Sequence, residues 1–103
     1  MIRRARHRPT EIEYMDFEGF GPGENGVDVL VWINENGGEA HDDADGWLYI
    51  KNPQRKNSRN RLQPGVDKVG RRLRWPSMEP TADFYRLEPE VWEDAYDDLG
   101  PAS

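Results

Sequence analysis

The chain has 103 residues, no cysteine and a net charge of −6, which limits it to one domain and excludes disulfides, thiolate metal sites and cysteine nucleophiles. Although 33% of the residues are charged, the 4 Trp, 4 Tyr and 3 Phe favour a small aromatic core over disorder. No apolar run approaches the ~20 residues of a membrane span, and the basic start lacks a signal-peptide core. We therefore expect one cytoplasmic domain over residues 1–103.

The N-terminal part predicts a basic arm at residues 1–8, then a strand. The stretch TEIEYMDF (10–17) alternates apolar and polar side chains, as a half-buried strand does. The alternation slips after Tyr14, which indicates a bulge or the end of the strand. The glycine-rich residues 18–26 that follow predict a loop.

Residues 24–36 fit two elements. Alternating β-branched residues from Val27 to Ile33 favour a strand. Asn25 as an N-cap and Gly37 as the left-handed residue after a last turn favour a helix. The residue pattern alone leaves both alternatives open.

The next segment predicts a polar turn, HDDADG (41–46), and a strand at 47–51 with apolar groups on both sides. The turn has some features of a calcium loop. However, its first ligand would be His41, and its twelfth position is Asn52 instead of the bidentate glutamate that calcium requires. Asp and Gly suit turns, so we interpret HDDADG as a turn.

Residues 52–65 predict a long basic loop, and VDKVGRRLRW (66–75) predicts one or two short strands broken at Gly70. The prolines that follow predict another connection. The last segment predicts a helix at 88–99, because Pro89 suits the first helical position and carboxylates in the early turns complement the positive end of the helix dipole. The expected packing face consists of Val91, Trp92, Ala95, Tyr96 and Leu99. The expected acidic face consists of Glu90, Glu93, Asp94, Asp97 and Asp98.

Charge is segregated along the chain. Residues 51–74 carry nine bases against the single acid Asp67, whereas residues 75–103 carry only Arg86 against eight acids. Two interpretations compete. The basic segment pairs with the acidic C-terminal stretch, or its guanidinium groups converge on an anion such as a nucleotide phosphate. A ring beside arginines would then stack on the base. The candidate ligand-binding residues are Trp47, Arg55, Arg59, Arg61, Arg71, Arg72, Arg74 and Trp75.

Four stretches, "IRRARHRPTEIEY", "WINENGGEAHDDADGWLYIKNP", "QPGVDKV" and "ADFYRLEPEVWEDAYD", resemble a widespread group of small phage and prophage proteins of unassigned role, in which the Trp-containing segment is typical of a helix. That group opens with a "KYRKKPVVIEA" strand, has a "PGDWVIRG" turn and closes with "GEFYPCKPDIFEATYE". This chain departs from the pattern at its turn, where Val66 separates Gly65 from Asp67 and no Trp follows. The resemblance implies a viral source and a helix at 24–36, but no reaction.

These observations predict an α+β fold: a small, mainly antiparallel sheet with a C-terminal helix and one internal helix. Neither His7 nor His41 has evident partners for catalysis or zinc, and we expect no enzyme activity, cofactor or metal site. We expect a phage accessory protein in the host cytoplasm that counters host immunity by sequestering a nucleotide-like signalling molecule as a homo-oligomer. The alternatives are a protein–protein inhibitor that uses the acidic helix in the manner of a DNA mimic, and a minor virion component whose basic arm touches DNA.

Overall fold

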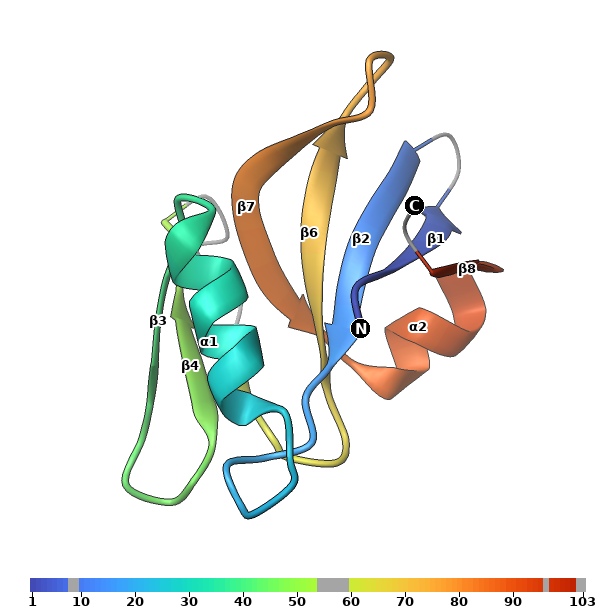
Figure 1. The fold of residues 1–103 in the computed structure, drawn as a ribbon. Helices are drawn as coiled ribbons and strands as arrows, with labels where there is room; N and C mark the ends of the chain where they lie inside the picture. The colour runs from blue at the N-terminus through green and yellow to red at the C-terminus, as the bar shows by residue number, and fades with distance from the viewer. Residues whose placement is uncertain (8–9, 54–59, 96, 102–103) are drawn as a thin grey trace.

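In a computed structural model, which describes residues 1–7, 10–53, 60–95 and 97–101, the chain forms two antiparallel sheets and two helices (Figure 1). The predicted α+β class is confirmed, although the strands form two sheets instead of one. The five-stranded sheet has the order β7-β6-β2-β1-β8, and the three-stranded sheet has the order β3-β4-β5. The strands are β1 (Arg3–His7), β2 (Thr10–Asp16), β3 (Glu39–Asp42), β4 (Leu48–Lys51), β5 (Arg61–Leu62), β6 (Lys68–Arg74), β7 (Glu79–Leu87) and β8 (Asp97–Pro101), and the helices are α1 (Gly26–Glu35) and α2 (Pro89–Ala95).

Both faces of the large sheet are covered at one end, which explains why the alternation in β2 slips. Ile12 and Tyr14 are buried in a small core that includes the half-buried Trp92 of α2. Met15 and Phe17 are buried in the main core, with residues of α1, the small sheet and β7. Figure 1 shows α1 and the small sheet on one side of the large sheet and α2 on the other.

The internal element is a helix, as the resemblance implied. Its Val29, Trp32 and Ile33 are buried, and this tertiary burial overrides the strand preference of β-branched residues. Gly37 has a φ of +89°, and the N–H of Gly38 closes the helix end by donating to the carbonyl of Ile33 over 3.0 Å.

Asn25 occupies the N-cap position of α1 but forms no side-chain cap. Its Nδ2 donates to the carbonyl of Asp16 over 2.6 Å, and its Oδ1 accepts from the N–H of Glu18 over 2.9 Å. The side chain therefore ties the glycine-rich loop to the end of β2 instead of capping the helix.

The predicted break at Gly70 is wrong, since β6 runs without interruption from Lys68 to Arg74. Gly70 lies beneath the ring of Tyr85 on the neighbouring strand. A Cβ built at Gly70 would meet ring atoms of Tyr85 at 2.7 Å, so the glycine provides space for the ring.

The two chain ends also differ from their predictions. The expected helix over 88–99 ends at Ala95, and Asp97–Pro101 forms β8, which pairs with β1. The expected N-terminal arm is β1, hydrogen-bonded between β2 and β8, with Ala5 fully buried. The helix ends early because β1 offers backbone partners on its second edge.

The predicted packing face of the C-terminal helix is only partly formed. Trp92 lies against Tyr14, with ring centroids 4.3 Å apart, but Val91 is 47% exposed. Tyr96 lies outside the described residues.

Candidate functional site

The structure divides the predicted ligand-binding residues into two groups. Arg61 and Trp47 belong to the small sheet and its turn, whereas the remaining described residues lie in or directly after β6. This second group consists of Arg71, Arg72, Arg74 and Trp75. Arg55 and Arg59 lie outside the described residues. The predicted single cluster is therefore not assembled by the described members.

Arg61 is held by the turn between β3 and β4. Its Nε lies 2.6 Å from Oδ2 of Asp43, and its Nη2 lies 2.7 Å from Oδ2 of Asp45. The guanidinium carbon lies 4.2 Å from the centre of the Trp47 ring. The guanidinium group of Arg61 is thus bound by carboxylates of its own chain.

Asp43 organises the same turn. Its Oδ1 accepts from the N–H of Asp45 over 2.9 Å and from the N–H of Trp47 over 3.1 Å. The hydrogen bond from Arg61 lowers the pKa of the Asp43 carboxyl, and the same bond raises the pKa of Arg61. The interpretation of HDDADG as a turn holds for residues 43–46, whereas His41 and Asp42 belong to β3 and pair with β4.

Arg71 and Arg72, adjacent on β6, are also committed within the chain. Arg71 is buried, its Nε donates to the carbonyl of Thr81 over 2.6 Å, and its Nη1 lies 3.4 Å from Oε1 of Glu13. Nε of Arg72 lies 3.4 Å from Oδ2 of Asp83. The alternative of internal pairing therefore holds for these two residues and for Arg61, but most partners come from residues 1–50 and not from the C-terminal stretch.

The end of the β6–β7 hairpin is different. Among the described residues, Arg74 forms no side-chain ion pair, and Trp75, the next residue, is 56% exposed. We call residues 74–79 the hairpin tip. Figure 1 shows the backbone of this tip projecting beyond the ends of the other strands.

The tip is nevertheless well ordered by its own hydrogen bonds. The N–H of Met78 and the hydroxyl of Ser77 both donate to the carbonyl of Arg74, over 2.5 Å and 3.2 Å. The hydroxyl of Thr81 donates to the carbonyl of Arg72 over 2.7 Å. The Trp75–Pro76 peptide bond is cis. The hydrogen bonds to the carbonyl of Arg74 hold the turn on which the exposed ring stands.

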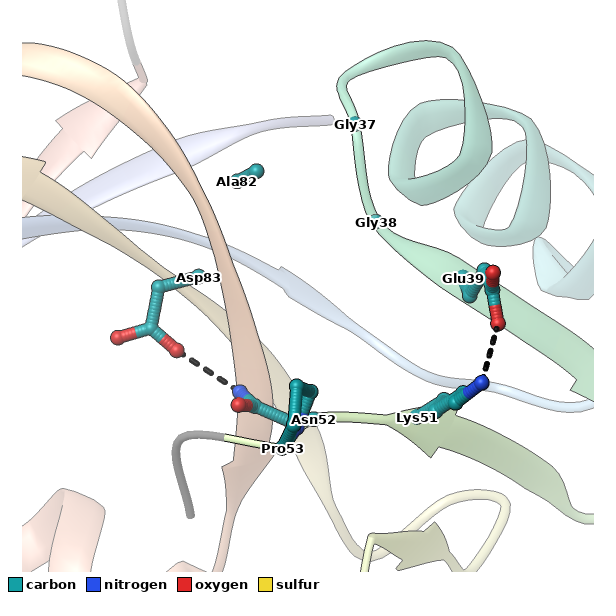
Figure 2. A pocket seen from close by; sticks show the side chains of 8 residues that line it. All are labelled: Gly37, Gly38, Glu39, Lys51, Asn52, Pro53, Ala82 and Asp83. Atoms are coloured by element: carbon teal, nitrogen blue, oxygen red, sulfur yellow. Dashed lines mark hydrogen bonds and ion pairs between the residues drawn. The ribbon is translucent and has the colours of Figure 1, made fainter.

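A cavity of about 350 Å³ lies between the end of α1, β4 and β7 (Figure 2). Its lining is Gly37, Gly38, Glu39, Lys51, Asn52, Pro53, Ala82 and Asp83. Its polar groups already bind one another. Lys51 Nζ lies 3.6 Å from Glu39 Oε2, and Asn52 Nδ2 donates to Asp83 Oδ1 over 2.8 Å. We therefore assign no ligand to this cavity, which sequence reasoning had not found because distant segments form it.

The predicted acidic helix face is divided by the early end of α2. Glu90 and Glu93 remain exposed on the helix, but Asp97 and Asp98 lie in β8.

A different helix, α1, carries exposed acids beside exposed apolar side chains. On α1, Val27 is 64% and Val31 is 46% exposed, and Asp28 and Glu35 are exposed beside them.

No group of three or more His, Cys, Asp or Glu residues in the described part of the chain is placed to hold a metal ion. No helix in that part is long and apolar enough to cross a membrane.

Comparison of the chain with family models, curated proteins and solved structures finds no match. The resemblance to small phage proteins therefore stays a hypothesis drawn from the sequence.

Proposed function

We propose that the protein is a non-catalytic phage accessory protein that acts by inserting its hairpin tip into a partner protein. The observation that carries this proposal is the 56% exposure of Trp75 at the end of a projecting hairpin. Trp, Tyr and Arg are the residues most often found to dominate protein–protein binding energy, and Trp75 directly follows Arg74, which forms no ion pair with a described residue. A small projecting tip of this kind is suited to a hollow on the surface of a partner.

The order of the tip supports the same function. Its turn is held by hydrogen bonds from Met78 and Ser77 to the carbonyl of Arg74. A preformed turn lowers the entropy lost when a partner closes around it. The exposed ring is thus presented on a turn that hydrogen bonds within the free protein already hold.

The expected energy is moderate. An aromatic side chain buries 150–250 Å², so covering the exposed part of Trp75 removes roughly 100 Å² from water and contributes about 2–3 kcal/mol. Trp75→Ala should therefore weaken binding about 30- to 150-fold. Trp75→Phe, which keeps an aromatic ring, should recover part of that loss.

A photo-crosslinking amino acid at position 75 tests the proposal in bacterial cells. The matched control carries the same group in place of Tyr49, which is 39% exposed on the small sheet. We expect covalent protein adducts, identified by mass spectrometry, from position 75 and not from position 49. Absence of adducts at 75, or the same adducts at both positions, contradicts the proposal.

The sequestration of a nucleotide stays a prediction, and it now depends on Arg74, Trp75 and residues outside the described ranges. Calorimetric titration with linear and cyclic nucleotides tests it directly. Heat that disappears in Trp75→Ala would replace protein docking with nucleotide binding as the role of the tip.

The role against host immunity follows from the phage resemblance alone. Expression of the chain in cells that carry a defence system should raise the plating of a sensitive phage. Trp75→Ala should remove this effect if the tip carries it. An unchanged effect in Trp75→Ala would separate the biological role from the hairpin.

A further inference from the structure

The β6–β7 hairpin contains a bulge directly below its tip. Arg71 of β6 stands opposite Phe84 of β7, and Leu73 stands opposite Pro80, so one residue of β6 between these pairs faces residues 81–83 of β7. We call residues 81–83 the β7 bulge. A bulge bends its strand, increases the local twist and redirects the segment beyond it. In Figure 1, β7 bends strongly in the half that leads to the tip.

Thr81 connects the two strands within this bulge. Its hydroxyl donates to the carbonyl of Arg72 over 2.7 Å and accepts from the N–H of Asp83 over 3.2 Å. Its own carbonyl accepts from Nε of the buried Arg71 over 2.6 Å. Side-chain hydrogen bonds thus reinforce the hairpin where the regular pairing of β6 and β7 is interrupted.

The bulge is also fixed to the small sheet. Nδ2 of Asn52, which directly follows β4, donates to Oδ1 of Asp83 over 2.8 Å and to the carbonyl of Phe84 over 2.5 Å. Asp83 is buried, and its Oδ2 lies 3.4 Å from Nε of Arg72. The base of the tip is therefore held by β6 on one side and by the end of β4 on the other.

We propose that the β7 bulge sets the direction of the hairpin tip and that Thr81 is a positioning residue for Trp75. Hydrogen bonds inside the tip hold the shape of its turn. The bulge holds the direction of that turn relative to the two sheets. This inference rests on the proposed function, because a fixed direction lowers the entropy that is lost when Trp75 docks on a partner.

NMR relaxation and residual dipolar couplings of the full chain test the inference without a partner. In wild type, we expect backbone order parameters of about 0.85 at residues 74–79, as in a rigid backbone. Thr81→Val keeps the size and branching of the side chain but removes both hydroxyl hydrogen bonds. The order parameters at 74–79 should then fall to about 0.6 or below. The dipolar couplings of these residues should shrink, while those of β1 and β2 stay unchanged.

Two variants control for other causes. Thr81→Ser keeps the hydroxyl and should restore the wild-type values at 74–79. Asn34→Ala also removes two hydrogen bonds, but at the edge of the small sheet, and should leave residues 74–79 as ordered as in wild type. Wild-type values in Thr81→Val, or an equal fall in Thr81→Ser or Asn34→Ala, overturn the inference.

Crosslinking in cells separates this inference from the proposed function. Adducts from position 75 should decrease several-fold in Thr81→Val and recover in Thr81→Ser, which supports both. Adducts at the wild-type level from a loosened tip would overturn the positioning role and leave the proposed function intact. If no variant yields adducts but Thr81→Val still loosens residues 74–79, the proposed function fails, and the bulge still sets the direction of the tip.

Discussion

The small sheet and the β6–β7 hairpin each contain a tryptophan and a neighbouring arginine. The arginine is bound by carboxylates in the first case and forms no ion pair with a described residue in the second. Arg61 lies on the ring of Trp47 and is bound by Asp43 and Asp45. Arg74 precedes the exposed Trp75 and has no ion-pair partner in the described part of the chain. The first pair is part of the architecture, and the second is available to another molecule.

The difference comes from the turns. The turn of the β3–β4 hairpin supplies the carboxylates of Asp43 and Asp45, which bind the guanidinium group of Arg61. The tip contains one carboxylate, that of Glu79, which stands opposite Arg74 in the register but forms no ion pair with a described residue. A basic and aromatic composition therefore does not define a binding site by itself. The carboxylates that the fold brings to each arginine decide which cations are free.

The largest effect should come from comparing two arginines of β6. Arg71 is paired with Glu13, and the two side chains are only 10% and 12% exposed. Arg71→Ala leaves Glu13 with an uncompensated charge and should lower the free energy of unfolding by about 3 kcal/mol. Arg74→Ala, at the exposed end of the same strand, should change it by less than about 0.5 kcal/mol. Urea unfolding measures both.

Glu13→Gln provides the control for this comparison. In the Arg71→Ala background it removes the orphaned charge and should restore part of the lost stability. Equal effects of Arg71→Ala and Arg74→Ala would show that the buried end and the exposed end of β6 do not differ as described.

The sequence predicted the elements whose local pattern and tertiary setting agree. The strand at 47–51 alternates because Leu48 and Ile50 on one side lie in a core, and the strand at 10–17 alternates up to Tyr14, beyond which its other side is buried as well. Gly37 ends α1 because it adopts a positive φ. The helical state of α1 required the resemblance, since its β-branched residues locally favour a strand.

The remaining features depend on contacts between distant residues. Gly70 indicates a break in any local interpretation, and only the ring of Tyr85 explains its place within a strand. The early end of α2 depends on the free edge of β1. Whether an arginine is paired likewise depends on residues that are distant in the sequence, as the ion pair between Arg71 and Glu13 shows. The segregation of charge along the sequence did not reveal these partners.

The outer edge of β3 in the small sheet is covered by a side chain of α1. Removing that side chain should have an intermediate effect on the free energy of unfolding. Nδ2 of Asn34 on α1 donates to the carbonyl of Ala40, and its Oδ1 accepts from the N–H of Ala40, each over 3.0 Å. This amide occupies the outward N–H and carbonyl of Ala40 on β3. Asn34→Ala should lower the free energy of unfolding by about 1–2 kcal/mol and promote association through the exposed strand edge.

Light scattering and urea unfolding of Asn34→Ala measure the two parts of this prediction. Asn34→Asp is the matched variant, since it keeps an acceptor for the N–H of Ala40 but loses the donor to its carbonyl. It should fall between wild type and Asn34→Ala. Wild-type stability and scattering in Asn34→Ala would show that the amide does not protect the edge.

The smallest effect should be a pH dependence confined to the closed turn. The hydrogen bond from Arg61 holds the pKa of Asp43 below its usual value of 3.8. A carboxyl whose pKa is lower in the folded state stabilises the fold above the unfolded pKa, and this contribution is lost as the pH falls through the folded pKa. Asp43→Asn should therefore unfold at less urea than wild type at pH 7, and the difference should close as the pH falls below 3.8.

Glu79→Gln is the control that sharpens the comparison between the two turns. Glu79 stands opposite Arg74 in the register of the open hairpin, is exposed, and forms no ion pair with a described residue. Its variant should match wild type in urea at every pH. A gap of similar size and pH dependence for Glu79→Gln would mean that Arg74 is paired in solution, and the tip would then be as closed as the turn that holds Arg61.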